Sequence, residues 1–124
     1  MKPSLAFIGL GTLGAVVAEH LLDMGFPLVV YNRTPAKTEA LVARGATRAS
    51  SPREAAARSE LVLSMVSDSA ALEDIALSPE GVLAGLPAGG IHADLSTVSR
   101  RTTRQLEVCY RAAGRTFLHA PVLG

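Results

Sequence analysis

The segment Leu5-Ala6-Phe7-Ile8-Gly9-Leu10-Gly11-Thr12-Leu13-Gly14 (residues 5–14) decides the fold of this chain. Its four apolar residues predict a buried strand, and a G-x-G-x-x-G hexapeptide leads from that strand into a helical pattern. Gly9 permits the tight turn, Gly11 lets a pyrophosphate approach the backbone, and Gly14 lets the helix pack closely on the strand. The N–H groups of Leu10 to Leu13 are expected to point at the phosphates, helped by the helix dipole. A plain tight turn is the alternative, but the context favours dinucleotide binding.

Short apolar runs alternate with helical patterns along the rest of the chain. Further strands are expected at 28–31, 61–66, 91–94 and 116–119, with a brief extended stretch near 46–48. Helices are expected at 13–24, at 35–45, from 52 onward, after a Ser67 or Asp68 cap, and after a Thr97 or Ser99 cap. This alternation predicts right-handed βαβ units. The expected fold is therefore α/β, a Rossmann-type doubly wound, mostly parallel sheet in one domain, 1–124.

The composition excludes several classes of protein. The 124 residues are 48% hydrophobic and 19% charged, which supplies one core and is unlike a disordered chain. A net charge of +1 gives no electrostatic argument for nucleic acid or an anionic membrane as a partner. One cysteine cannot form an internal disulfide, which favours a reducing compartment. Without a membrane-length apolar run or a signal-peptide core, the sequence predicts a soluble cytoplasmic domain that acts on a small molecule.

The end of the second strand indicates which dinucleotide is bound. NAD sites usually place an acidic residue here, which accepts a hydrogen bond from the ribose 2′-OH. This chain has neutral Asn32, which does not repel a 2′-phosphate, and Arg33, which offers it a charge-assisted partner and offers adenine a flat face. Thr34 adds a hydroxyl donor, and Lys37 lies one helical turn later. Alternatively, Arg33 and Lys37 are solvated surface charges. The pattern favours NADP, with NAD as the second choice.

Five motifs, the first of which contains the glycine turn, cover essentially the whole chain. They are FIGLGTLG at 7–14, YNRT at 31–34, LSMVSD at 63–68, DLST at 94–97 and FLHAPVLG at 117–124. In this order they resemble the cofactor domain of the β-hydroxyacid dehydrogenases, the family of 3-hydroxyisobutyrate dehydrogenase and 6-phosphogluconate dehydrogenase. The family motifs are F-I-G-L-G-x-M-G, an NADP-type second strand, M-L-P-D, D-x-S-T and F-x-D-A-P-V-S-G-G. Together they are more specific than the glycine turn alone.

The resemblance implies an oxidoreductase that moves a hydride between the nicotinamide and the carbon bearing a β-hydroxyl group, with a lysine as general acid and base. It implies that Ser96 bonds the substrate near the reacting centre and that Thr97 lies beside the nicotinamide ribose. Leu123 and Gly124 would help to hold the substrate carboxylate. Helix capping is the alternative role for Ser96 and Thr97. The backbone that lines the cofactor would be that of Met65, Val66 and Ser67.

The chain departs from the family pattern at three points. Arg100 stands where the family usually has proline, which alters the helix entry. Leu123 replaces a serine, so a bulkier or less polar carbonyl or imine competes with a small hydroxy acid as the substrate. The sequence ends at Gly124, before the family's catalytic lysine and helical second domain, and neither Lys2 nor Lys37 is placed to replace that lysine. We therefore expect an N-terminal part of a longer, homo-oligomeric enzyme, inactive by itself.

Two other functions fit the same residues. An imine reductase has the same cofactor domain and differs in the residue that replaces the lysine. A non-catalytic dinucleotide-binding or sensing domain would bind the cofactor without turnover. No metal site is expected, because the three histidines lack ligand spacing and have no cysteine cluster to join. His92 is expected to be structural, and Cys109 is expected to be a buried small hydrophobe.

Overall fold

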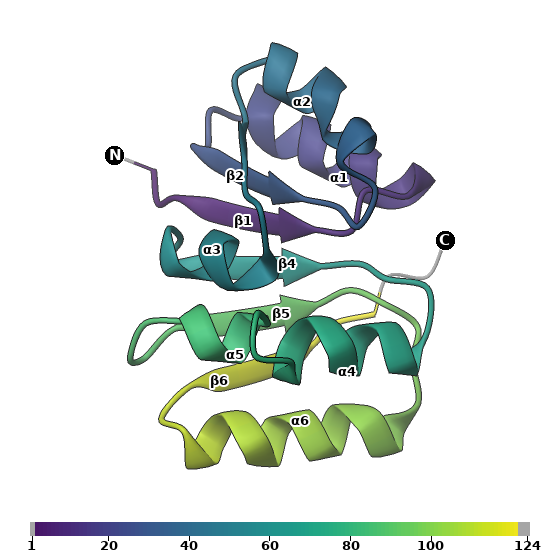
Figure 1. The fold of residues 1–124 in the computed structure, drawn as a ribbon, viewed down its shortest axis with the longest axis vertical. Helices are drawn as coiled ribbons and strands as arrows, with labels where there is room; N and C mark the ends of the chain where they lie inside the picture. Colours follow the sequence, from purple (N-terminus) through teal and green to yellow (C-terminus); the bar gives the residue numbers. More distant parts are fainter. Residues whose placement is uncertain (1, 122–124) are drawn as a thin grey trace.

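The computed structural model describes residues 2–121 and contains a sheet of six strands (Figure 1). The strands are β1 (Leu5–Ile8), β2 (Leu28–Tyr31), β3 (Thr47–Arg48), β4 (Leu61–Ser64), β5 (Ile91–Asp94) and β6 (Thr116–His119). Their order is β3-β2-β1-β4-β5-β6, and every neighbouring pair is parallel. The direction of winding reverses between β1 and β4, which leaves a crevice at the carboxyl ends of these strands. The expected Rossmann-type fold is confirmed, with all six strands parallel.

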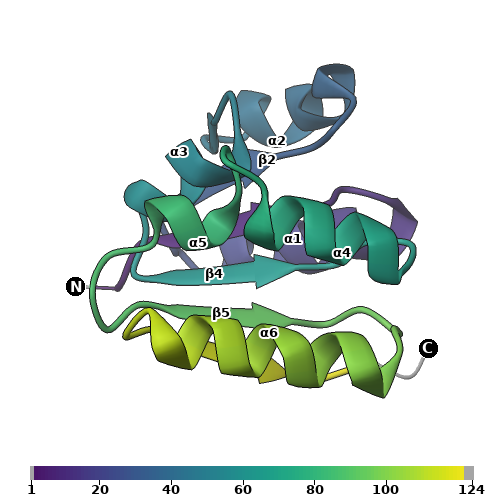
Figure 2. The ribbon, with the colours of Figure 1, turned by 60° about the horizontal axis from the view of Figure 1, so that its bottom comes forward.

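Helices cover both faces of the sheet. On one face lie α1 (Thr12–Asp23), the 3-10 helix η1 (Pro35–Thr38) and α2 (Glu39–Ala43). On the other lie α3 (Pro52–Ala57), α4 (Ser69–Leu77), α5 (Val82–Gly85) and α6 (Arg100–Ala112), which are in front of the sheet in Figure 1 and are seen from another side in Figure 2. The helix expected over 35–45 is divided into η1 and α2. The sequence did not predict α5, because four residues are too few to show a helical period. Among residues 2–121, no helix is long and apolar enough to cross a membrane.

The strands show how each face of the sheet is packed. In β1, Leu5 and Phe7 pack on the α1 side, whereas Ala6 and Ile8 pack on the α3 side, and all four side chains are buried. A strand that is covered on both faces has a continuous apolar sequence, as β1 does. In β4 and β5, buried residues alternate with half-buried ones. Cys109 of α6 is half-buried rather than buried as expected.

The beginnings of the helices differ in one respect that matters for the site. The N-cap residues of α3, α4 and α6 are Ser51, Asp68 and Ser99, and each of these side chains accepts a hydrogen bond from the backbone N–H three residues later. Of the candidates expected as caps, Asp68 rather than Ser67 caps α4, and Ser99 rather than Thr97 caps α6. α1 begins after Gly11 and has no side-chain cap. Its first N–H groups are therefore free of a side-chain partner within the chain described.

Candidate functional site

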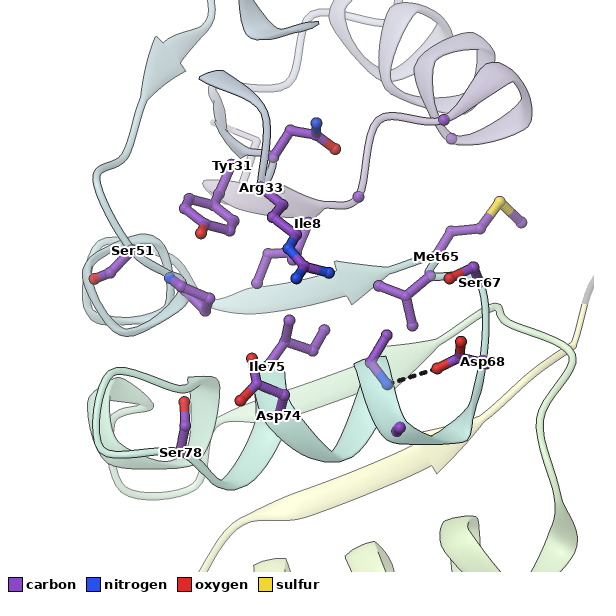
Figure 3. Close-up of a pocket in the computed structure, with 18 of the residues that line it drawn as sticks. Ile8, Tyr31, Arg33, Ser51, Met65, Ser67, Asp68, Asp74, Ile75 and Ser78 are labelled. Carbon is purple, nitrogen blue, oxygen red and sulfur yellow. Dashed lines mark hydrogen bonds between the residues drawn. The ribbon is translucent and has the colours of Figure 1, made fainter. Parts of the chain in front are cut away.

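A pocket of about 1130 Å³ lies at the carboxyl ends of β1, β2 and β4 (Figure 3). Its walls are the glycine turn, the end of β2, the start of α3, the loop after β4 and one face of α4. This volume is large for a small-molecule site and suits an extended ligand. The predicted cofactor residues that line the pocket are Gly9, Gly11, Thr12, Leu13, Gly14, Asn32, Arg33, Met65, Val66 and Ser67.

The three glycines of the turn meet different surroundings. Gly9 has φ +98°, and a Cβ added there would lie 2.1 Å from the carbonyl oxygen of Met65. A Cβ at Gly14 would lie 2.3 Å from the carbonyl oxygen of Gly9, so this glycine sets the close approach of α1 to β1. A Cβ at Gly11 would meet nothing within 4 Å. The fold therefore requires Gly9 and Gly14, whereas Gly11 leaves open space beside the pocket.

The start of α1 is suited to an anion. Gly11, its N-cap, offers no side chain to the first turn, and that turn contains no acidic residue. The N–H groups of Thr12 and Leu13 therefore present partial positive charge at the pocket wall. The structure corrects the expectation for Leu10, which is 3% exposed. Its N–H donates to Oδ1 of Asn32 at 2.7 Å and so is already paired inside the protein.

Asn32 connects the end of β2 to the glycine turn. Besides accepting from Leu10, its side chain donates through Nδ2 to the carbonyl oxygen of Thr34 at 3.1 Å. An aspartate at this position has no donor for the Thr34 carbonyl, so the neutral amide is matched to the local backbone. The sequence predicts that neutral Asn32 does not repel a 2′-phosphate. The structure adds that it holds the turn in place.

Arg33 supplies the positive charge of the pocket. Its exposed side chain points from the end of β2 into the pocket (Figure 3). Of the described residues that line the pocket, it is the only cation, whereas Asp68, Asp74 and Glu80 are anionic. The exposed residues Thr34 and Lys37 do not contribute to the pocket lining. Recognition of a further anionic group in this pocket therefore depends on one guanidinium.

The loop after β4 forms the opposite wall. β4 ends at Ser64, two residues earlier than expected. The N–H of Met65 donates to the carbonyl oxygen of Ile8 at 2.9 Å, and the N–H of Val66 donates to Oγ of Ser96 at 2.7 Å. Ser96 is 2% exposed, so its hydroxyl lies inside the protein. In this structure Ser96 therefore holds the loop, and its expected contact with the substrate stays a prediction.

Thr97, Leu123 and Gly124 are the other residues expected near the nicotinamide ribose or the substrate. Thr97 is exposed and lies outside the pocket lining. Leu123 and Gly124 lie outside the residues that the structure describes.

Behind the loop lies a group of buried polar side chains. His92 bonds through Nε2 to Oγ of Ser64 and through Nδ1 to the hydroxyl of Tyr110, each at 2.7 Å, which is the structural role expected of it. Burial lowers the pKa of His92 from 6.5 to about 3, so this imidazole is neutral at pH 7. Burial also raises the pKa of the Asp94 carboxyl, against the opposing effect of hydrogen bonds from Ser64 and Ser96. The pKa of the Tyr110 hydroxyl is likewise raised by burial.

Sequence reasoning missed the wall that α4 contributes. Ala71, Asp74, Ile75 and Ser78 all line the pocket. Their spacing of three, four and seven residues marks one face of a helix, and this helix follows β4 after the loop of residues 65–68. A helix face that follows the carboxyl end of a central strand was the available signal.

The fold and the glycine turn define the class of this protein as a Rossmann-type nucleotide-binding domain. The chain belongs to the family of the NAD-binding domain of 6-phosphogluconate dehydrogenase, whose sequence profile matches residues 4–124. The uncharacterized oxidoreductase YfjR of Bacillus subtilis is 41% identical over 120 residues, which are 97% of this chain and 42% of that protein. The cytokine-like nuclear factor N-PAC of Danio rerio is 37% identical over 120 residues, 97% of this chain and 26% of that protein.

Two solved structures show the same fold as this chain. A 3-hydroxyisobutyrate dehydrogenase from Mycobacterium tuberculosis, solved with L-serine, superposes with a TM-score of 0.90 and 27% identity, covering 100% of this chain and 42% of that one. An imine reductase from Myxococcus stipitatus in complex with NADP⁺ gives a TM-score of 0.90 and 30% identity, covering 98% and 42%. The resemblance to the β-hydroxyacid dehydrogenases is thereby confirmed. The chain spans less than half the length of each of these four relatives.

Proposed function

We propose that this chain is the NADP(H)-binding part of an oxidoreductase that transfers a hydride between the nicotinamide and a β-hydroxy acid or a related carbonyl compound. The observation that carries the proposal is the uncapped start of α1 beside Gly11, which shares its pocket with the Arg33 guanidinium. A helix N-terminus with open space in front of it receives a phosphate group, and a guanidinium beside it receives another. Family membership and the NADP⁺ complex of a relative support the same cofactor. When bound, the nicotinamide supplies the hydride chemistry.

Each part of the pocket would hold one part of the dinucleotide. The open space at Gly11 admits the pyrophosphate, which the N–H groups of Thr12 and Leu13 would hold. Arg33 would bind the 2′-phosphate of the adenosine half, with Thr34 and Lys37 close to it in the sequence. The nicotinamide half would then lie on the β4 side of the crevice, between the loop 65–67 and the region of Thr97.

The preference for NADP(H) over NAD(H) depends on Arg33. The pocket contains three carboxylates and one guanidinium, so a 2′-phosphate has a single strong partner there. Asn32, by being neutral, adds no repulsion. NAD(H) remains the competing cofactor, since neither the glycine turn nor the β4 loop distinguishes the two.

A second candidate is an imine reductase, which the likeness to the NADP⁺-bound imine reductase favours. A third is cofactor binding without turnover, which the likeness to a nuclear factor favours. Neither lysine lines the pocket, and Lys2 lies over the ring of Phe26 with Nζ 4.8 Å from its centre. The proposal therefore assigns no lysine of this chain as the general acid and base.

Calorimetric titration of the purified chain with NADPH and with NADH tests the proposal. We expect NADPH to bind about 10- to 100-fold more tightly, because a charge-assisted hydrogen bond to the 2′-phosphate is worth about 1.5–3 kcal/mol. Arg33→Ala should bring the two affinities together, whereas Arg101→Ala, which removes a guanidinium from an exposed position of α6, should not. Binding of neither dinucleotide would refute the cofactor, and equal binding would refute the NADP preference.

The reaction class is tested by following oxidation of NADPH with two kinds of acceptor. A semialdehyde acid should be reduced if the β-hydroxyacid dehydrogenase reaction is correct, and a cyclic imine should be reduced if the second candidate is correct. Because this chain is expected to be inactive by itself, both assays use the product of the whole gene. Tight binding of NADPH with reduction of neither acceptor by that product would favour cofactor binding without turnover.

A further inference from the structure

Five buried side chains form one continuous hydrogen-bonded series between α6 and the loop after β4. Starting from α6, they are Tyr110, His92, Ser64, Asp94 and Ser96, and the exposed fraction of each is 2% or less. The joining distances, in that order, are 2.7, 2.7, 2.6 and 2.9 Å. The series ends where Oγ of Ser96 accepts from the N–H of Val66 at 2.7 Å. We call these five side chains the buried relay.

Counting protons fixes the direction of each bond in the buried relay. Oδ1 of Asp94 accepts from the hydroxyls of both Ser64 and Ser96. The hydroxyl of Ser64 has then used its one proton, so it accepts from Nε2–H of His92. His92 is therefore assigned the Nε2–H tautomer, and its Nδ1 accepts from the hydroxyl of Tyr110. Every donor and acceptor of the series has a defined partner.

The arrangement suits positioning and not proton transfer. Both ends of the buried relay are inside the protein, because Tyr110 is 0% exposed and the last acceptor is satisfied by the backbone N–H of Val66. Among the described residues, no buried side-chain nitrogen or oxygen lacks a hydrogen-bond partner. A fully satisfied buried network makes one geometry much more favourable than any other.

The geometry that the buried relay selects is that of the pocket wall. Met65, Val66 and Ser67 line the pocket between the end of β4 and the Asp68 cap of α4. Oδ2 of Asp94 also accepts from the N–H of Ser96 at 3.1 Å, so the backbone after β5 is held together with the loop after β4. Both loops lie at the carboxyl ends of β4 and β5, where the second half of a dinucleotide would lie.

We propose that His92 and Tyr110 are positioning residues of the cofactor site, acting through Ser64, Asp94 and Ser96 to hold the Val66 loop in the conformation that receives the nicotinamide half. This inference rests on the proposed binding of NADP(H). His92 and Tyr110 touch no part of the pocket themselves. Their effect is confined to the β4 side, whereas Arg33 and the glycine turn act on the adenosine half and the pyrophosphate.

The test uses variants of the purified chain and two ligands, NADPH and 2′,5′-ADP, which lacks the nicotinamide half. Tyr110→Phe removes one oxygen from the buried relay without changing the shape of the ring. His92→Leu removes both ring nitrogens, whereas His92→Gln keeps a donor for Ser64. Thr103→Val is the matched control, since it removes another buried hydroxyl from α6 that bonds only to the carbonyl oxygen of Arg100.

We expect His92→Leu and Tyr110→Phe to raise the dissociation constant of NADPH about 3- to 10-fold while that of 2′,5′-ADP changes less than about twofold. Hydrogen exchange of the Val66 amide should become about tenfold faster relative to that of Val30, a buried residue of β2. In His92→Gln the NADPH affinity and the Val66 exchange rate should both be close to those of the parent chain. Thr103→Val should change neither.

An unchanged Val66 exchange rate in His92→Leu would overturn the inference, as would equal losses of affinity for the two ligands. If the unaltered chain binds neither ligand, the proposed function is wrong, and the Val66 exchange rate by itself decides whether the buried relay holds the loop. If His92→Leu fails to fold, the isosteric Tyr110→Phe gives the answer.

Discussion

Alanine at Gly14 and alanine at Gly11 add the same methyl group three residues apart, but the structure predicts opposite consequences. At Gly14 the new Cβ would lie 2.3 Å from the carbonyl oxygen of Gly9 and 3.3 Å from Cε1 of Phe7. Relief of the first contact requires α1 to move away from β1 by about 1 Å, because the interior is close-packed. Overpacking costs about 1–3 kcal/mol where side chains can adjust, and here the obstacle is backbone. We expect Gly14→Ala to lower the free energy of unfolding by at least about 3 kcal/mol.

At Gly11 the methyl group would meet no atom of the protein within 4 Å. Its backbone, with φ −66° and ψ −175°, is one that any residue adopts, so the stability should change by less than about 1 kcal/mol. The methyl group would instead occupy the space in which a pyrophosphate meets the N–H groups of Thr12 and Leu13. Loss of one charge-assisted hydrogen bond, about 1.5–3 kcal/mol, weakens NADPH binding about 10- to 100-fold.

Two measurements on both variants check this pair of predictions. Urea unfolding followed by far-ultraviolet circular dichroism gives the free energy of unfolding, and calorimetric titration gives the affinity for NADPH. Each variant is the control for the other, because the chemical change is identical. A Gly14→Ala chain as stable as the parent would refute the close packing of α1 on β1. A Gly11→Ala chain with the parent's affinity would refute the proposed position of the pyrophosphate.

Three further predictions concern charge, pH and the start of α4. Arg33→Asp should reverse the cofactor preference from NADPH to NADH, and an unchanged ratio of dissociation constants would contradict the assignment of the 2′-phosphate. Because the pKa of His92 is lowered from 6.5 to about 3 in the folded chain, the unfolded chain binds the extra proton first, so stability should fall by up to about 1.4 kcal/mol per pH unit as the pH drops below about 6.5. The raised pKa of Asp94 acts in the opposite direction at lower pH. Urea unfolding between about pH 7.5 and pH 5 should therefore show a free energy of unfolding that depends less steeply on pH in His92→Gln than in the parent. Equal slopes would refute the assignment to His92. Asp68→Ala and Ser99→Ala should each lower the free energy of unfolding by about 1 kcal/mol through a lost helix cap, but only Asp68→Ala should also weaken NADPH binding, since only that cap lies in the pocket.

The sequence predicted the parts of this protein that depend on neighbours along the chain. Four of the strands begin and end where their apolar runs do, and the glycine turn has the positive φ and the tight contacts that its spacing implied. Arg33 reaches the pocket as expected, because it follows β2 at the carboxyl edge of the sheet, where the pocket lies. The sequence placed the end of β4 too late and did not predict α5. Both errors occur where a loop or a very short helix is too short to show a hydrophobic periodicity.

Only the tertiary structure decided which polar groups pair with one another. Ser64 lies opposite Asp94 because β4 and β5 pair in one particular register, and a shift of β5 by one residue would place the two side chains on opposite faces of the sheet. The partners within the buried relay are separated by up to 30 residues in sequence, as are Ser96 and the N–H of Val66. For this reason the sequence predicted a substrate contact for Ser96 and did not predict the hydrogen bonds that its hydroxyl makes inside the protein. Local sequence determines backbone conformation over a few residues, whereas these hydrogen bonds exist only after distant strands have been brought into register and water has been excluded from between them.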